Sequence, residues 1–180
     1  MLAADKPVFS EVLQYNKLET GELSNTPRCL SLSAQVQQAV EMACKAHHRP
    51  MDSVRVSIDT EHDHLWIDGF LFEQVLRNLL TNALKYGEHK PVFLRAVADA
   101  QLLSVEVEDQ GLGLSPELLP RLFQPFARGS NAAHLPGTGL GLSIAHRAAL
   151  VMGGSLRLLR SGETGSVFVC AVPVSPCQPG

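Results

Sequence analysis

The sequence predicts a single α/β (α+β) domain built as a two-layer sandwich, with a mixed, mainly antiparallel sheet and helices on one face. Helical and strand-like segments follow one another in mixed runs rather than in strict alternation, which favours this layering. The chain has 180 residues, the usual length of one domain. Its content of 45% hydrophobic and 18% charged residues is typical of a globular protein.

Composition and charge exclude several classes of protein. A net charge of −3 argues against a general nucleic-acid binder. No apolar run approaches the roughly 20 residues that a membrane span needs, and the N-terminus lacks the pattern of a secretory signal. We therefore expect no direct membrane contact by this segment. The four cysteines form no C-x-x-C pair, which predicts four reduced thiols in a cytosolic protein.

Residues 1–23 are predicted to form a separate piece. A helix with apolar positions at Val8, Val12 and Leu13 ends near Gly21, because glycine tolerates the left-handed conformation that follows a helix. A helix this short cannot bury its apolar face alone. We expect it to be the C-terminal stub of a longer helix that packs against something outside this chain.

Residues 24–174 are predicted to form the main domain, followed by a frayed tail at 175–180. The main domain opens with a short strand at 28–30. Ser31 then caps a helix that Pro50 closes. Alternating apolar residues predict a strand at 54–58, and a second short strand follows at 65–67.

A long helix is predicted over residues 68–86, because apolar residues recur there at i, i+3, i+4, i+7 and i+8. Two alternating strands follow at 92–98 and 102–108. Residues 110–139 are rich in glycine and proline, which is typical of a long functional loop. The remaining predicted elements are a helix at 140–151 and strands at 155–159 and 166–172.

Polar side chains follow one face of the long helix. Asn78, Asn82 and Lys85 are spaced i, i+4 and i+7, and Tyr86 comes next. Amide carbonyls are hard oxygen donors that suit a hydrated magnesium ion, and a lysine suits phosphate. The alternative is a solvated helix face that carries an ordinary pair of asparagines.

A second motif follows the strand at 102–108. It consists of Asp109, Gly111 and Gly113. The glycines let the backbone approach a flat ligand, and the carboxylate can accept a hydrogen bond from an exocyclic amine such as adenine N6. The alternative is an ordinary D-x-G turn.

A third motif opens the helix at 140–151. Its sequence is Gly137-Thr138-Gly139-Leu140-Gly141. Backbone N–H groups freed by glycine form an anion site together with the helix N-terminus. The motif is neither a Walker loop nor a dinucleotide fingerprint. The alternative is a flexible turn.

Together these motifs resemble the ATP-binding catalytic domain of sensor histidine kinases, within the GHKL ATPase superfamily. Residues 78–86 resemble the N box, 109–113 the first glycine box, 122–128 the F box of the ATP lid, and 137–142 the second glycine box. The order and spacing of four motifs are more specific than any one of them. Residues 18–23 are similar to the end of the second helix in the dimerisation hairpin of these kinases.

The resemblance implies a Bergerat-type fold that binds ATP and Mg²⁺. Asp109 would bind the adenine amine, and Tyr86 would lie against the adenine ring. Asn82 would hold the magnesium ion, with Asn78 beside it. The residues implied as catalytic are Asn78, Lys85 and Arg128, the last two facing phosphates. Those implied as nucleotide-binding are Asn82, Tyr86, Asp109, Gly111, Gly113, Gly137, Thr138, Gly139, Leu140 and Gly141. We expect the lid, residues 114–134, to be poorly ordered without nucleotide.

The full phosphoacceptor motif of the family, a histidine followed by an acidic residue and usually by Arg-Thr-Pro, occurs nowhere in this sequence. The resemblance therefore implies a catalytic domain that transfers the ATP γ-phosphate to a histidine on a dimerisation hairpin outside this chain. A response regulator would be a further partner. The location would be cytoplasmic, including the cytoplasmic part of a membrane-bound sensor.

Three alternatives remain open: a GHKL-type ATPase, a serine-directed kinase and a nucleotide-binding scaffold without turnover. Hydrolytic members of the superfamily carry glutamate where this chain has Asn78. A carboxamide cannot take a proton from water at neutral pH. This position favours phosphotransfer over hydrolysis.

Overall fold

The computed structural model describes residues 6–130, 135 and 137–180. Its helices are α1 (Lys6–Glu19), α2 (Leu32–Ala46), α3 (Gly69–Tyr86) and α4 (Gly141–Val151), with 3-10 turns at Met51–Ser53 and Leu119–Arg121. Its strands are β1 (Arg28–Ser31), β2 (Val54–Thr60), β3 (His64–Ile67), β4 (Val92–Ala98), β5 (Leu102–Asp109), β6 (Ser155–Gly162) and β7 (Gly165–Pro173).

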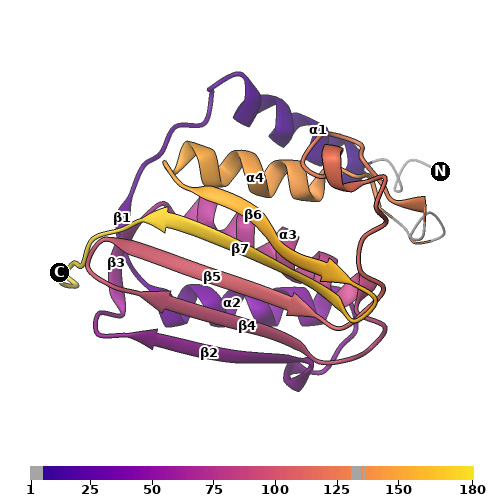
Figure 1. Ribbon diagram of the computed structural model, residues 1–180. Helices are drawn as coiled ribbons and strands as arrows, with labels where there is room; N and C mark the ends of the chain where they lie inside the picture. Colours follow the sequence, from indigo (N-terminus) through magenta and orange to yellow (C-terminus); the bar gives the residue numbers. More distant parts are fainter. Residues whose placement is uncertain (1–5, 131–134, 136) are drawn as a thin grey trace.

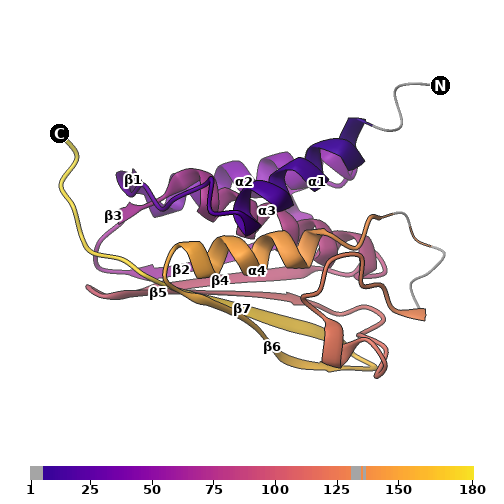
Figure 2. The same cartoon turned by 90° about the horizontal axis from the view of Figure 1, so that it is seen from above.

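The main sheet has five strands in the order β2-β4-β5-β7-β6. Strands β2 and β4 are parallel, and every other neighbouring pair in this sheet is antiparallel. The helices lie on one face of the sheet (Figures 1 and 2). The predicted two-layer architecture is therefore confirmed. The sequence did not predict that β1 and β3 pair with each other as a separate two-stranded sheet.

The starts of α2 and α3 follow from their capping residues. The Ser31 hydroxyl accepts a hydrogen bond from Ala34 N at 3.1 Å. One oxygen of Asp68 accepts from Leu71 N at 3.0 Å, and the other accepts from Thr26 N at 2.8 Å. Each cap satisfies a backbone donor that has no partner within its helix. Asp68 also ties the start of α3 to the chain segment that enters β1.

The core lies between the helices and the sheet. The apolar stripe of α3 is fully buried, as its periodicity predicted. Strands β4 and β5 alternate buried and more exposed residues along their length. This packing holds α3 firmly over the sheet, so the polar residues at its C-terminal end occupy fixed positions.

Helix α1 lies along α4 (Figures 1 and 2). Leu18 is only 1% exposed, and the Glu19 carboxylate lies 3.4 Å from Arg147 Nε. Helix α4 therefore covers part of α1, and Val12 is partly buried. Leu13, which the sequence assigned to the same apolar face, stays 43% exposed, and Phe9 is 66% exposed. That this face needs a partner outside the chain therefore stays a prediction. That residues 1–23 are the stub of a dimerisation helix stays a prediction.

The C-terminal tail is joined to β1 by a disulfide between Cys29 and Cys177. Trp66 N donates to Ser175 O at 2.8 Å, and Cys177 N donates to His64 O at 3.0 Å. The expectation of four reduced thiols was therefore wrong at Cys29 and Cys177. The expectation of a frayed tail was wrong at residues 175–177, and for residues 178–180 it stays a prediction. Spacing could not reveal the pair, because its members lie 148 residues apart. Such a cross-link contributes about 2–5 kcal/mol to stability.

None of the helices within the described residues combines the length and the apolarity that a membrane crossing requires.

Candidate functional site

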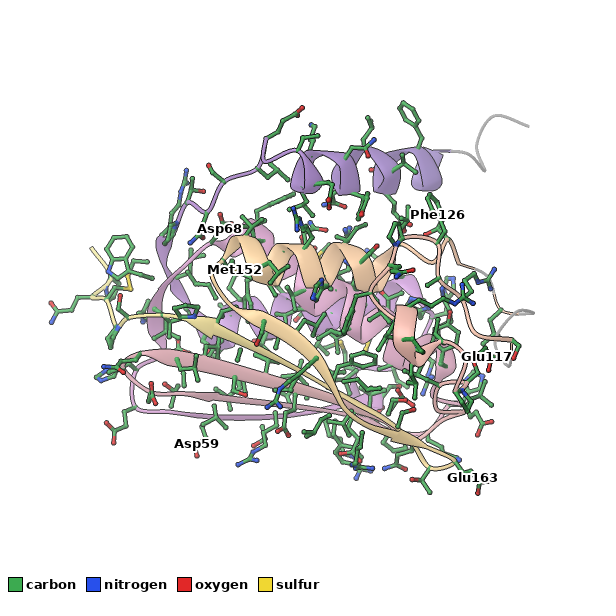
Figure 3. The ribbon with its side chains drawn as sticks, turned by 45° about the horizontal axis from the view of Figure 1, so that its top comes forward. Asp59, Asp68, Glu117, Phe126, Met152 and Glu163 are labelled. Carbon is green, nitrogen blue, oxygen red and sulfur yellow. A yellow bond between two sulfur atoms is a disulfide. The ribbon has the colours of Figure 1, made fainter. Side chains whose placement is uncertain are left out.

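A cavity of about 450 Å³ lies where the C-terminal part of α3 meets the N-terminus of α4, and α1 and the loop after β5 complete its wall. It brings together residues from all three polar motifs. The predicted site residues that line it are Asn78, Asn82, Lys85, Tyr86, Asp109, Gly113, Arg128, Gly137, Thr138, Gly139 and Gly141. Glu117 and Phe126 lie on the loop beside this end of the molecule (Figure 3).

The polar stripe of α3 faces the cavity. Asn78, Asn82 and Lys85 all line it, as their helical spacing predicted. Asn78 Nδ2 donates to the backbone oxygen of Gln74 at 2.7 Å. The amide oxygen of Asn78 lies toward α4, only 3.1 Å from the position that a Cβ on Gly141 would take. A side chain at position 141 would therefore press on the amide oxygen of Asn78.

Lys85 is the main cation of the α3 wall. Its Nζ lies 5.5 Å from the centroid of the Tyr86 ring, and 2.8 Å from the position of a Cβ on Gly137. Burial lowers the pKa of Lys85, Arg128 lowers it further, and the nearby Glu11 carboxylate opposes both effects. A partly desolvated ammonium interacts strongly with an anion, because little water screens the pair. The position suits a phosphate group.

Asp109 is the last residue of β5 and only 9% exposed. Its Oδ1 accepts a hydrogen bond from Gly111 N at 2.9 Å. Burial raises the pKa of this carboxyl, whereas backbone N–H groups of Gly111 and Ser166 act to lower it. The result is a buried acceptor, held by the end of the sheet at the cavity wall.

Gly111 and Leu140 do not line the cavity, although the resemblance assigned both to nucleotide binding. A Cβ on Gly111 would lie 1.8 Å from Tyr86 O, so this glycine lets the loop after β5 pack on the end of α3. Leu140 is fully buried in the core at the start of α4. Both residues therefore support residues that line the cavity without lining it themselves.

Gly113 lines the cavity and also fixes the turn after β5. Its φ of +69° is left-handed, and a Cβ there would lie 2.0 Å from Gly162 O. Only glycine permits both the conformation and the contact. The turn after Asp109 is therefore anchored against the end of β6.

Sequence reasoning missed two titratable residues of the cavity wall, Glu11 of α1 and His47 at the end of α2. Burial lowers the pKa of His47. No local motif marks either residue, because each reaches the cavity from a distant segment. Thr138 donates a hydrogen bond to the Glu11 carboxylate across 127 residues of sequence.

The lid is described in part. Residues 114–130 contain the short turn Leu119–Arg121, and the Phe123 ring stacks on His146 with centroids 4.6 Å apart. Arg128 lines the cavity and donates to the backbone oxygen of Leu135. Residues 131–134 lie outside the described residues. That the lid is poorly ordered without nucleotide stays a prediction.

The cavity fits a magnesium ion that arrives with phosphate. Among the described residues, no group of three or more His, Cys, Asp and Glu side chains is placed to hold a metal. The amide oxygens of Asn78 and Asn82 are the hard donors on α3. Magnesium usually keeps several waters and takes only one or two protein ligands beside substrate phosphates. This donor set suits such shared coordination.

A family model described as "Histidine kinase-, DNA gyrase B-, and HSP90-like ATPase" matches residues 67–176. That range contains most of the cavity wall: the α3 stripe, Asp109 and the glycines before α4. It begins just before Asp68, the residue that caps α3.

Curated relatives match nearly the whole chain. Sensor protein TorS of Escherichia coli is 32% identical over 93% of this chain and 18% of its own length. Sensor histidine kinase MtrB of Mycolicibacterium paratuberculosis is 29% identical over 93% of this chain and 30% of its own length. The chain thus spans less than a third of the length of either relative.

Solved structures of similar fold include the histidine kinase AdeS of Acinetobacter baumannii. It has a TM-score of 0.73 and 20% identity, and the match covers 93% of this chain and 77% of that one. Full-length ShkA, solved in complex with AMPPNP, has a TM-score of 0.77 and 23% identity over 94% of this chain and 35% of that one. These likenesses confirm the fold.

Proposed function

The chain belongs to the family of histidine kinase-, DNA gyrase B- and HSP90-like ATPases, and from this premise we propose that it binds Mg²⁺-ATP in the cavity and transfers the γ-phosphate to a histidine outside this chain. The observation that carries the proposal is the convergence of three polar motifs on one cavity. They supply a buried carboxylate, a stripe of amides with a lysine, and a glycine-rich helix N-terminus.

Each part of the wall matches one part of the nucleotide. Asp109 accepts a hydrogen bond from the adenine amine, and the Tyr86 ring lies against the base. Lys85 and Arg128 face the phosphates, and the backbone N–H groups at the start of α4 surround them. Asn82 would hold the magnesium ion, with Asn78 beside it. When bound, this ion neutralises the charge that develops on the phosphate oxygens.

The transfer step needs positioning more than acid–base chemistry. An imidazole nitrogen attacks the γ-phosphorus, and the bond from that phosphorus to the bridging oxygen breaks. ADP leaves with the electrons of that bond, and the imidazole proton passes to solvent. Asn78 supports this reading, because its amide is engaged with Gln74 O and has no basic site to activate water.

We further propose the domain roles that the resemblance implies. Residues 1–23 are the end of a dimerisation helix, and residues 24–174 are the ATP-binding domain. The relatives are several times longer than this chain, which leaves room for a histidine-containing hairpin. A response regulator then receives the phosphate, and the location is the cytoplasm.

Phosphotransfer in trans tests the proposal. With radiolabelled ATP and Mg²⁺, we expect no label on this chain alone and acid-labile label on a dimerisation hairpin supplied separately. Transfer should be slow, because the untethered hairpin lacks a high effective concentration. A hairpin with its acceptor His replaced by Gln is the control and should stay unlabelled.

Two outcomes of this assay contradict the proposal. Acid-labile label on this chain in the absence of the hairpin would place the acceptor within it. Fast release of phosphate without any acceptor would favour a GHKL-type ATPase.

A further inference from the structure

Glu11 is an acidic residue at the part of the cavity wall where Lys85 and the glycine-rich start of α4 suit an anion. It projects from α1, which lies along α4 with its N-terminal half toward the loop that precedes α4 (Figures 1 and 2). The Glu11 carboxylate accepts a hydrogen bond from Thr138 Oγ1, and it interacts electrostatically with Lys85. Thr138 Oγ1 in turn accepts from Leu140 N at 3.2 Å. The carboxylate thus occupies the same donors that an anionic ligand requires.

The contact that holds α1 in place is limited. Among residues 9–19 of α1, Leu18 is the one buried side chain, and Val12 and Tyr15 are partly buried. The ion pair of Glu19 with Arg147 is substantially exposed. An exposed ion pair contributes little to stability. Helix α1 can therefore leave α4 at a modest cost in free energy.

We propose that the Glu11 carboxylate holds the place of the terminal phosphate, so that docking of α1 on α4 and binding of a nucleoside triphosphate compete. The inference rests on the proposed function. A triphosphate carries its last phosphate to the Lys85 and Thr138 end of the cavity, where a second anion beside Glu11 is repelled. A diphosphate ends short of this position. Glu11 therefore sets the preference of the docked form between ATP and ADP, and ATP binding releases α1.

Calorimetry on the Glu11→Gln variant tests the competition. Glutamine keeps the size of the side chain and can still accept from Thr138, but it removes the charge. We expect about tenfold tighter binding of ATP and less than about a twofold change for ADP. Glu61→Gln is the matched control, because Glu61 lies exposed in the turn between β2 and β3. It should leave both affinities unchanged.

Amide exchange provides a second readout on the unaltered protein. A non-hydrolysable ATP analogue should accelerate exchange in residues 9–19 of α1, whereas ADP should not. Equal ATP affinity of the wild type and Glu11→Gln would overturn the inference but leave the proposed function standing. So would an unchanged exchange of α1 in the presence of the analogue. Failure of every variant to bind any adenine nucleotide would overturn both.

Discussion

We expect the Asp109→Ala variant to bind ATP about ten- to hundredfold more weakly than the wild type. The carboxylate is a buried acceptor at the cavity wall, and a hydrogen bond to a charged group is worth roughly 1.5–3 kcal/mol. Alanine leaves the adenine amine without a partner in a place that water reaches poorly. Isothermal titration calorimetry with ATP and Mg²⁺ measures the loss.

The matched control for this prediction is Asp59→Ala. Asp59 is exposed on β2 and is not among the residues that line the cavity. It should leave the affinity unchanged. Replacing Asp109 also removes the hydrogen bond from Gly111 N, which loosens one turn only. Circular dichroism should therefore show that both variants are folded. Equal ATP affinity of wild type and Asp109→Ala would remove Asp109 from the adenine site.

The second large effect is expected at Asn82. Replacement by alanine should remove most of the gain in ATP affinity that Mg²⁺ provides, and it should lower phosphotransfer to the hairpin by about 100-fold or more. The reason is that the amide oxygen of Asn82 is a hard donor in a wall without a carboxylate cluster among the described residues. Loss of a metal's charge stabilisation costs several kcal/mol in a transfer step.

Titration of ATP with and without Mg²⁺ separates metal binding from nucleotide binding. The Asn82→Ala variant should still bind ATP without metal, since Lys85 and Asp109 remain. Asn25→Ala is the control of the same residue type, because Asn25 lies exposed in the segment before β1. If Asn82→Ala kept the full Mg²⁺-dependent gain, the assignment of Asn82 to the metal would be wrong.

The long helix α3 shows how much structure can be predicted from a local sequence pattern. Its apolar period predicted its extent and its buried face, and the structure adds that Asp68 caps its start. The same period predicted that Asn78, Asn82 and Lys85 share one side, and the structure places all three in the cavity. These features depend only on residues a few positions apart, so they can be predicted from the sequence.

Contacts between distant segments could not be predicted in the same way. The packing of α1 on α4, the approach of Glu11 to Thr138 and the disulfide of Cys29 with Cys177 all join parts far apart in the chain. No periodicity or spacing encodes such tertiary contacts, because they depend on how the helices pack on one another and on the sheet. Gly111 shows a related limit. The motif that contains it reaches the cavity, but Gly111 itself packs on Tyr86 O instead of lining the cavity.

If the cavity between α3 and α4 is the nucleotide site, hydrogen–deuterium exchange should detect the ligand there. The protein is compared with and without a non-hydrolysable ATP analogue and Mg²⁺. We expect protection of residues 78–86, 109–114 and 137–141, which approach the cavity from three separate segments. Unchanged exchange in these three segments, or protection confined to the neighbouring cavity around Arg49 and His89, would contradict this assignment.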